Sequence, residues 1–445
     1  MYELVMTPFR RLAITRTAPI GFVFWFGFGL SVGVLMVANS QLTGDQVQML
    51  NLGWQLSHNH RWISHGMITS AGGFSPGGFA GLLIAAPLML WNDYRAPALF
   101  ILLLNAGAFL LLVRALRAAL TPFGVQLLLV LGWLSPWHLY FAAHVWDPNF
   151  MFVFAVLHLV TAQRMAQYKE TGTTAAHVLL IGLGLQVHTS VAILCILSAV
   201  LFFTGRLKVC WTGCAIGMGV CGASLVPWFL AAHQDPTLIP GDKGFLFRGL
   251  VYVYPVLRGV IYWVKLSSLS FVRRMYALDF RTVVGPVAGP YLTAAAKALL
   301  RLANVTLILS AWLQWRFFRK AYRQFVSVRP AEYRPRSWLR FYVTAMCAAA
   351  LIAFALSPTT IMFWQVFIAM PASVIAVAMS AEVLARSRWK RITLRVARIW
   401  VFASAAILLS QAVAAPMYRC GGRILNGSRP MLEDLHVRLE CLEHS

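Results

Sequence analysis

The sequence predicts an all-α polytopic membrane protein, and its composition and long apolar segments are the observations that predict it. Of the 445 residues, 59% are hydrophobic and only 12% are charged, and the mean hydropathy is +0.69. Soluble globular domains carry about 25% charged residues. Several apolar runs approach the roughly 20 residues that a helix needs to cross a bilayer. These runs are rich in Leu, Ala, Val and Phe, without the alternation of polar and apolar residues that membrane-spanning strands show.

The basic charge of the chain has an explanation in the same fold class. The sequence holds 38 Lys and Arg residues against 14 Asp and Glu residues, which gives a formal net charge of +24. The basic residues cluster between apolar runs, most densely at 316–340 and 386–391. Cytoplasmic loops of membrane proteins collect Lys and Arg in this way. We therefore expect a lipid bilayer as the partner of this charge, and no nucleic acid.

The distribution of positive charge orders the spans. Arg10, Arg11 and Arg16 precede the first apolar run, so the N-terminus is expected inside. Continuing along the chain gives about eleven transmembrane helices and places the C-terminus outside. The spans are expected at about 20–39, 97–113, 123–142, 149–163, 174–187, 190–205, 210–231, 291–315, on either side of the turn Ser357–Thr360, and at 397–415.

Three regions follow from this order. Residues 1–231 are expected to form a catalytic transmembrane module, residues 232–290 a basic outer loop, and residues 291–445 a variable C-terminal transmembrane module with an outer tail. Within the first module, the outer loop 40–96 is too long for a simple connector, because connections beyond about 12–15 residues tend to be functional. We interpret it as an active-site loop with amphipathic interfacial helices.

The apolar stretch 79–91 in that loop decides the topology after it. It is shorter than a span and suits an interfacial helix. If it does not cross, Arg114 and Arg117 fall in the cytoplasm, in agreement with the charge rule.

Two acids stand out on this map. Asp45 and Asp147 both fall at the outer ends of helices, at a similar membrane depth. Ionisable groups at such depth are costly and indicate function. Each has a simpler alternative as a helix cap, since Asp45 begins a helical segment and Asp147 precedes Pro148. The pairing of the two on one face favours a functional role.

The motifs around these acids resemble a known family. They are Gly44-Asp45 after the first span, the Gly/Pro-marked segment 76–91, Tyr94-Arg95 before the second span, and Trp146-Asp147-Pro148 after the third. Over residues 20–230 this pattern is similar to that of the GT-C class of integral-membrane glycosyltransferases. That class includes the protein O-mannosyltransferases and the aminoarabinose transferases of lipid A.

The resemblance implies roles for these residues. Asp45 would be the catalytic base and Asp147 a second carboxylate at the outer face. The donor would be a sugar on a polyprenyl phosphate, used outside the cytoplasm, and the address would be a bacterial inner membrane with the active site facing the periplasm. The chain departs from the family at Gln46, where relatives often have an acid, and at Ser75-Pro76-Gly77, where many have a Lys.

Because this lysine is absent, other side chains must bind the donor phosphate. We expect Arg95, His65, Lys243 and Arg248 to bind it, because a phosphate leaving group needs cations rather than a general acid. The basic loop segment 243–281 has an alternative role as a surface that contacts lipid headgroups.

Elementary chemistry agrees with this class. A carboxylate accepts the proton of the acceptor hydroxyl as the new bond forms, and the transition state resembles an oxocarbenium ion. We expect His144, Trp146, Asn149 and His60 to line the substrate site. A divalent metal is a possible cofactor, with ligands among Asp45, Asp147 and the histidines His58, His60, His65, His144 and His188, although such histidines more often bond to backbone or water.

Three functions remain open from the sequence. The first is an inverting hexosyl or pentosyl transferase acting on a lipid-linked or envelope-glycan acceptor. The second is a lipid or glycan transporter or flippase without covalent chemistry, which would need ionisable groups within its spans. The third is a membrane O-acyltransferase, for which His138 or His158 would be the catalytic residue.

Overall fold

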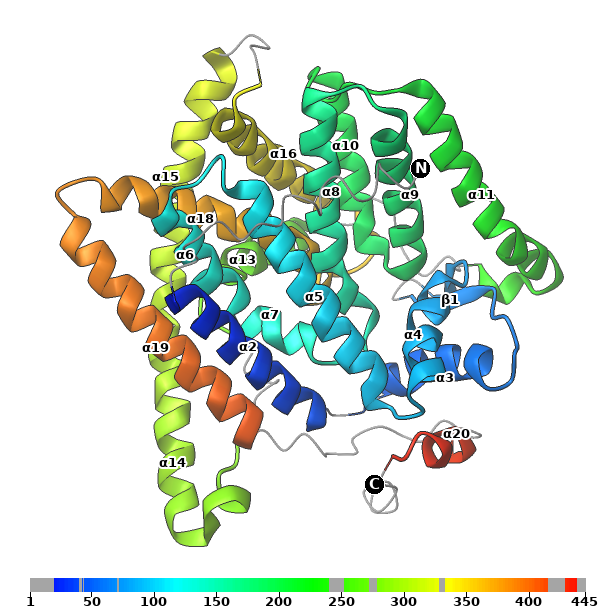
Figure 1. Ribbon diagram of the computed structural model, residues 1–445, viewed down its shortest axis with the longest axis horizontal. Coiled ribbons are helices and arrows are strands. Elements are labelled where there is room, and N and C mark those ends of the chain that lie inside the picture. The colour runs from blue at the N-terminus through cyan, green and yellow to red at the C-terminus, as the bar shows by residue number, and fades with distance from the viewer. Residues whose placement is uncertain are drawn as a thin grey trace.

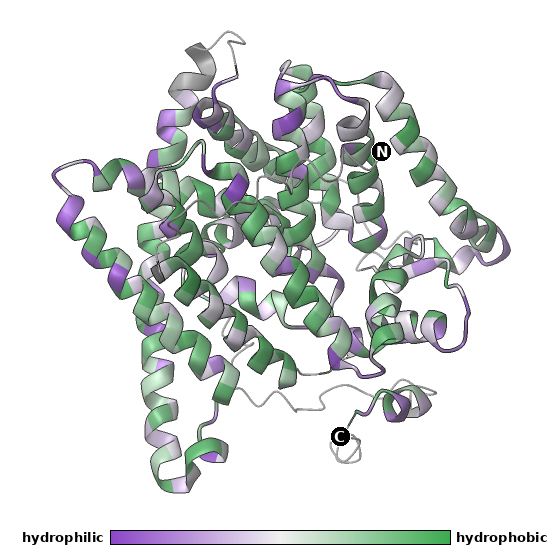
Figure 2. Cartoon of the chain, viewed as in Figure 1, coloured by the Kyte–Doolittle hydropathy of each residue, from purple (hydrophilic) through white to green (hydrophobic). Residues whose placement is uncertain are grey.

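The computed structural model describes residues 20–39, 42, 44–69, 72–239, 252–271, 278–327, 333–414 and 429–437. In these ranges the chain is almost entirely helical, with one two-stranded sheet (Figure 1). The prediction of an all-α polytopic fold is confirmed. Figure 2 shows the reason for the arrangement: hydrophobic residues cover most of each helix, and hydrophilic residues gather at the helix ends and connections.

The helices are, in chain order, α2 (Ile20–Ala38), α3 (Gly44–Ser57), α4 (Phe79–Leu90), α5 (Arg95–Leu116), α6 (Pro122–Leu128), α7 (Pro136–Ala142), α8 (Met151–Gln167), α9 (Thr171–Val187), α10 (Ala192–Phe203), α11 (Trp211–Gln234), α13 (Tyr254–Lys265), α14 (Arg281–Ala303), α15 (Val305–Ser327), α16 (Pro335–Leu356), α17 (Phe363–Val366), α18 (Met370–Ala385), α19 (Lys390–Ala414) and α20 (Arg429–Asp434). The strands are β1 (His65–Ile68) and β2 (Phe74–Pro76). Short turns of other helix types include the π-helix η1 (Leu129–Trp133) and the 3-10 helices η2 (Asp147–Phe150) and η3 (Thr189–Val191).

The protein is a multi-pass membrane protein. Eight described helices are long and apolar enough to cross a bilayer, and a bent pair makes a ninth if its halves form one span. The pair is Pro122–Trp133 and Pro136–Ala142, which meet at 55°. Pro136 lacks a backbone N–H and therefore interrupts the helix at this point. The spans expected at 174–187 and 190–205 correspond to α9 and to Thr189–Phe203, which are shorter apolar helices.

One expected span is longer than the sequence suggested. Instead of a single helix at 291–315, α14 and α15 follow each other with a break at Asn304, and the apolar path runs from Arg281 to Tyr322 (Figure 1). The limits drawn from the sequence left out Arg281 before the span and Arg316 after it, whereas the apolar path includes both. Long basic side chains tolerate such positions because their stems lie along apolar surface while the charge reaches water.

The first loop contains both expected interfacial helices, α3 and α4, packed against each other. Gly53 on α3 allows this approach, because a Cβ there would collide with Ile84 on α4. Between them the chain forms an antiparallel hairpin that the sequence did not predict, with His65 opposite Pro76 and Ile68 opposite Phe74.

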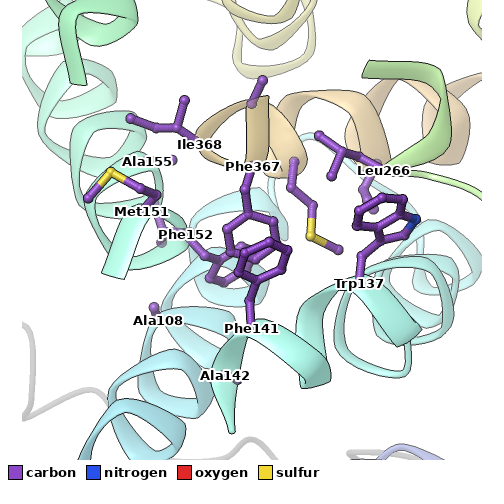
Figure 3. Packing of buried hydrophobic residues seen from close by; sticks show 14 of the residues in the cluster. Ala108, Trp137, Phe141, Ala142, Met151, Phe152, Ala155, Leu266, Phe367 and Ile368 are labelled. Atoms are coloured by element: carbon purple, nitrogen blue, oxygen red, sulfur yellow. The ribbon is translucent and has the colours of Figure 1, made fainter. Parts of the chain in front are cut away.

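An aromatic core fixes the segment that leads to Asp147. Phe141 on α7 stacks on Phe367, next to α18, with ring centroids 4.1 Å apart. Figure 3 shows these two rings with Trp137, Phe152 and Leu266 around them. The Trp137 indole N–H also donates to the backbone oxygen of Ser270 at 3.1 Å. Residues far apart in the sequence therefore hold α7 in place, and the chain enters η2 from this fixed point.

The C-terminal segment 429–437 packs on the first loop. The Trp54 indole N–H on α3 donates to the Asp434 carboxylate at 2.6 Å, and the Tyr94 backbone N–H donates to the oxygen of Leu435 at 3.2 Å. Leu432 and Leu435 are fully buried in this contact region. In Figure 1 the red α20 lies beside the blue α3. The C-terminal segment and the loop that carries Asp45 therefore lie at the same end of the molecule.

We expect Trp54→Phe to loosen α3. The substitution keeps an aromatic ring but removes the N–H that Asp434 accepts, which should cost about 1 kcal/mol of local stability. Hydrogen exchange followed by mass spectrometry should then show faster exchange in α3 and in 429–437. Trp62→Phe, at an exposed tryptophan of the same loop, is the control and should leave both segments unchanged. Equal exchange in the two variants would contradict a role for this hydrogen bond.

Candidate active site

A cavity of about 670 Å³ opens where the first loop meets the ends of several spans. Its walls come from α3, the β1–β2 hairpin, η2, the η3–α10 segment, the end of α16, and α17. The lining residues are Asp45, Gln48, Met67, Ile68, Thr69, Phe74, Ser75, Pro76, Trp146, Asp147, Pro148, His188, Thr189, Ser190, Ala192, Ile193, Ile196, Ala353, Phe354, Leu356, Ser357, Pro358, Thr359, Ile361, Trp364 and Gln365.

Asp45 and Asp147 both line this cavity, although they come from different elements. Asp45 lies in the first turn of α3, and Asp147 is the first residue of η2, after Trp146 in extended conformation. Asp147 is buried, whereas Asp45 is open to the cavity. The two carboxylates are near enough to repel each other electrostatically.

The surroundings of Asp45 change its acidity. Neighbouring apolar groups remove part of its hydration and raise the pKa of this carboxyl above the ordinary aspartate value of 3.8. A carboxylate with a raised pKa is a better proton acceptor than an ordinary surface aspartate.

His188 adds a third polar group beside Asp147. It connects α9 to η3, and its Nε2 lies 3.9 Å from Asp147 Oδ2. Burial lowers the pKa of His188 to about 4, so the ring is neutral near pH 7 and the contact is not an ion pair there. Its Nδ1 lies 2.8 Å from the Ser190 hydroxyl. The sequence indicated His188 only as one of several histidines that could bind a metal.

Of the four residues expected to line the substrate site, the structure places one in the cavity wall and three outside it. Trp146 does line the cavity and packs against Trp364, with ring centroids 5.3 Å apart. Asn149 is fully buried, and its amide donates to the backbone oxygen of His144. The Nδ1 atom of His144 in turn lies 2.7 Å from the backbone oxygen of Tyr140. His60 is an exposed residue of the loop, with a φ of 52°. Asn149 and His144 thus hold the loop that positions Asp147, and neither they nor His60 reach the cavity wall.

The expected phosphate ligands do not line the described cavity. Arg95 forms a bidentate ion pair with Asp93, with Nη2 and Oδ2 2.5 Å apart. The ring of His65 packs on Phe74 at 4.3 Å between ring centroids, outside the lining set. Two further candidates, Lys243 and Arg248, lie outside the described residues. Among the described residues that line the cavity there is no Lys or Arg.

Helix α13 carries two cations that are linked to the cavity wall through a chain of aromatic contacts. Lys265 Nζ lies 5.8 Å from the centroid of the Tyr262 ring, and Arg258 donates to the Tyr262 hydroxyl at 3.3 Å. Tyr262 in turn contacts the ring of Phe363 at 6.0 Å, and Phe363 is adjacent to the lining residue Trp364. The sequence placed both cations in the basic loop without a specific role.

The wall contributed by the C-terminal half was not predicted. It consists of the turn Ser357–Thr359 together with Trp364 and Gln365. The Gln365 side chain accepts a hydrogen bond from the Met362 backbone N–H at 2.8 Å, which fixes the start of α17. The available signal was the position of this turn, which the charge rule placed at the same outer face as Asp45 and Asp147.

The two histidines considered for acyltransferase chemistry, His138 and His158, contact neighbouring polar groups in the protein interior. His138 is fully buried and contacts the Gly132 oxygen through Nδ1 at 3.1 Å. His158 contacts the hydroxyls of Tyr342 at 2.9 Å and Ser198 at 2.8 Å. Neither histidine lines the 670 Å³ cavity.

The described part of the chain contains no set of side chains that could bind the divalent metal considered from the sequence. There, no three His, Cys, Asp or Glu side chains gather closely enough to hold an ion. Asp45, Asp147 and His188 around the cavity form no such group. The donor set therefore does not fit a metal, and the chemistry below uses none.

Comparison with known proteins addresses the fold. No protein-family model and no curated protein matches the sequence. Among solved structures, the chain is similar to ArnT from Cupriavidus metallidurans in the apo state, with a TM-score of 0.52 and 12% identity over 90% of this chain and 76% of that chain. This chain has the ArnT-like polytopic membrane fold. The predicted resemblance to the GT-C class is thereby confirmed at the level of the fold.

Two further structures are similar over most of this chain. ArnT bound to undecaprenyl phosphate matches with a TM-score of 0.49 and 13% identity, over 90% of this chain and 77% of that chain. The archaeal oligosaccharyltransferase AglB from Archaeoglobus fulgidus, in complex with an inhibitory peptide and a dolichol-phosphate, matches with a TM-score of 0.47 and 11% identity. That match covers 89% of this chain and 56% of AglB.

The hairpin wall gives a test of the site's construction. Gly77 has a φ of +81°, and a Cβ there would collide with the side chain of Gln186. Gly205 has a φ of +68° but open space around it. We expect Gly205→Ala to cost about 1 kcal/mol for the backbone conformation alone. Gly77→Ala should cost more and lower the thermal unfolding temperature further. An equal effect of the two substitutions would show that Gln186 does not support the hairpin.

Proposed function

We propose that the protein is an inverting glycosyltransferase that moves a sugar from a polyprenyl-phosphate donor to a lipid-linked or envelope-glycan acceptor. The observation that carries the proposal is the convergence of Asp45 and Asp147, from two distant segments, on one cavity of an ArnT-like fold. The polyprenyl-phosphate donor is what the resemblance to the GT-C class implies. The corresponding location is a bacterial inner membrane, with the cavity facing the periplasm.

Asp45 is the general base in this mechanism. It is open to the cavity and has a raised pKa, so its carboxylate can take the proton of an acceptor hydroxyl. The acceptor oxygen then bonds to the anomeric carbon, while the bond from that carbon to the phosphate oxygen breaks. The phosphate leaves with the electron pair, and attack from the opposite face inverts the configuration.

Asp147 and His188 orient the sugar in this scheme. Their side chains lie together in the wall, and the ring of Trp146 beside them offers an apolar face. A carboxylate near the anomeric carbon also stabilises the positive charge that develops there in an oxocarbenium-like transition state.

The leaving phosphate requires cations that approach from outside the described lining residues. Lys243, Arg248, Arg95 and His65 remain the ligands expected from the sequence. To these we add Arg258 and Lys265, because both contact Tyr262, which packs on Phe363, the sequence neighbour of the lining residue Trp364. Arginine is suited to this role since its guanidinium can donate two parallel hydrogen bonds to a phosphate.

One buried acid lies within a span, where an ionisable group could indicate transport, but its contacts give it a structural role. Glu382 on α18 is buried and pairs with Arg336 at 2.7 Å. It also accepts hydrogen bonds from the backbone N–H and the hydroxyl of Thr121, at 2.6 and 2.7 Å. These bonds tie α18 to the start of α6, which is a structural role.

Asp45→Asn tests the proposal directly. The amide keeps the size of the side chain but accepts no proton, so we expect transfer to fall by at least about 100-fold. The measurement is mass spectrometry of envelope lipids and glycans from cells that carry either form, followed by transfer assays with purified protein. Asp235→Asn is the control, because Asp235 is an exposed acid outside the lining set. Full transfer by Asp45→Asn would refute the mechanism, and transport of labelled lipid without covalent transfer would favour a flippase.

The pH dependence of transfer provides a second test. Asp45 acts only when it is deprotonated, so kcat/KM should fall as the pH drops through its pKa. Because burial raises that pKa, the fall should begin at a higher pH than an ordinary aspartate with a pKa of 3.8 would give. The residual activity of Asp45→Asn should lack this inflection. If both forms show the same acidic limb, another group titrates there.

A further inference from the structure

A second large cavity lies at the other end of the bundle. It has a volume of about 560 Å³ and runs between η1, α15, α18 and α19. Its walls are almost entirely apolar, and the exceptions are Arg316, Arg388 and Thr393. Three tryptophans, Trp312, Trp389 and Trp400, also line it. We call this cavity the basal groove.

A small basic recess adjoins the groove. It has a volume of about 50 Å³, and Arg316, Lys320, Arg340 and Ser380 line it. Arg316 belongs to both cavities. The combined site therefore has an apolar part, large enough for hydrocarbon chains, and a polar part with several cations at its mouth.

The basal groove is far from the candidate active site. Helix α16 connects the two regions: Ala353 near its end lines the active-site cavity, and Arg340 near its start lines the basic recess. A rise of about 1.5 Å per residue separates these positions by about 20 Å along the helix axis. In Figure 1 the elements of the groove, α15, α18 and α19, lie together, away from α3 and β1. The two sites thus lie toward opposite ends of α16, a helix long and apolar enough to span a bilayer.

The aromatic residues hold the cations at the mouth of the groove. The guanidinium of Arg316 lies over the Trp312 ring, 4.9 Å from its centroid, and that of Arg388 lies over Trp389 at 5.6 Å. Tryptophan is enriched at membrane interfaces, where its ring lies at headgroup level. Two guanidinium groups fixed at this level suit the phosphate of a lipid headgroup.

We propose that the basal groove binds an anionic phospholipid from the leaflet opposite to the active site. Its phosphate contacts Arg316, Arg340 and Arg388, and one acyl chain occupies the apolar groove. Basic pockets between transmembrane helices bind acidic headgroups by this combination of charge and hydrocarbon burial. This site is separate from the donor site of the proposed transferase, and it does not depend on that function.

Lipid selectivity of the purified full-length chain tests the proposal. Binding of phosphatidylglycerol and of phosphatidylcholine should be measured by native mass spectrometry and by thermal shift at about 0.15 M salt. The test variants are Arg388→Gln, in the exposed turn before α19, and Arg316→Gln combined with Arg388→Gln. We expect selectivity for phosphatidylglycerol to fall about fivefold in the single variant and about twentyfold in the double variant.

A matched control separates this site from general surface charge. Arg319 on α15 and Arg395 on α19 are exposed and lie outside the lining sets of both basal cavities. Arg319→Gln combined with Arg395→Gln removes the same amount of charge from the same region of the chain and should leave selectivity within about twofold of the wild type. An equal loss in control and test variants, or no loss in either, would overturn the proposal.

Two competitors distinguish other ligands. Inorganic phosphate at millimolar concentration should not displace phosphatidylglycerol, because it lacks the chain that fills the groove. Undecaprenyl phosphate should displace phosphatidylglycerol no more strongly than other lipids that carry the same phosphate charge. Strong displacement by free phosphate would reduce the site to an anion site, and preferential binding of undecaprenyl phosphate would assign the groove to the carrier lipid. Either result would refute the phospholipid assignment.

Discussion

The cost of placing two carboxylates side by side in an apolar protein constrains the rest of this structure. Asp147 is buried in the cavity wall, and Asp45 lies close enough to repel it. Burial and like charge both oppose ionisation, so neither position is stabilising by itself. The fold must supply this stability elsewhere, and the buried aromatic packing of Phe141 on Phe367 is one contribution near the site. Acids held against such a cost indicate a function at that position.

The same packing explains why the cavity needs both halves of the chain. Asp45 and Asp147 belong to the N-terminal half, whereas Ser357–Thr359 and Trp364, which also line the cavity, belong to the C-terminal half. The C-terminal segment 429–437 then returns to α3 through the bond between Trp54 and Asp434. Parts of the chain that the sequence assigned to a variable module therefore take part in shaping the candidate site.

The sequence predicted what depends on composition and charge. The apolar runs located the spans, and the length limit on 79–91 identified α4 as an interfacial helix. The sequence did not predict contacts between residues that lie far apart along the chain. No local pattern shows that Asn149 bonds to the His144 oxygen, or that Arg95 pairs with Asp93. The sequence showed that these side chains were polar and near the acids, but it did not show the partners that they have in the fold. The wall at Ser357–Thr359 was missed for the same reason, since only tertiary structure brings it to Asp147.

For the proposed transferase, electrostatics also limits how a donor lipid could enter. The described lining carries two acids and no Lys or Arg, so an incoming phosphate would be repelled unless cations lie beside the cavity. We proposed Arg258 and Lys265 on α13 for this role because they contact Tyr262, which packs on Phe363, the sequence neighbour of the lining residue Trp364. An anion held there would leave the acidic wall to face the sugar, whose anomeric carbon becomes positive during transfer. In the proposed mechanism, separate regions for the negative phosphate and the positive transition state would make the acidity of the cavity an advantage to catalysis.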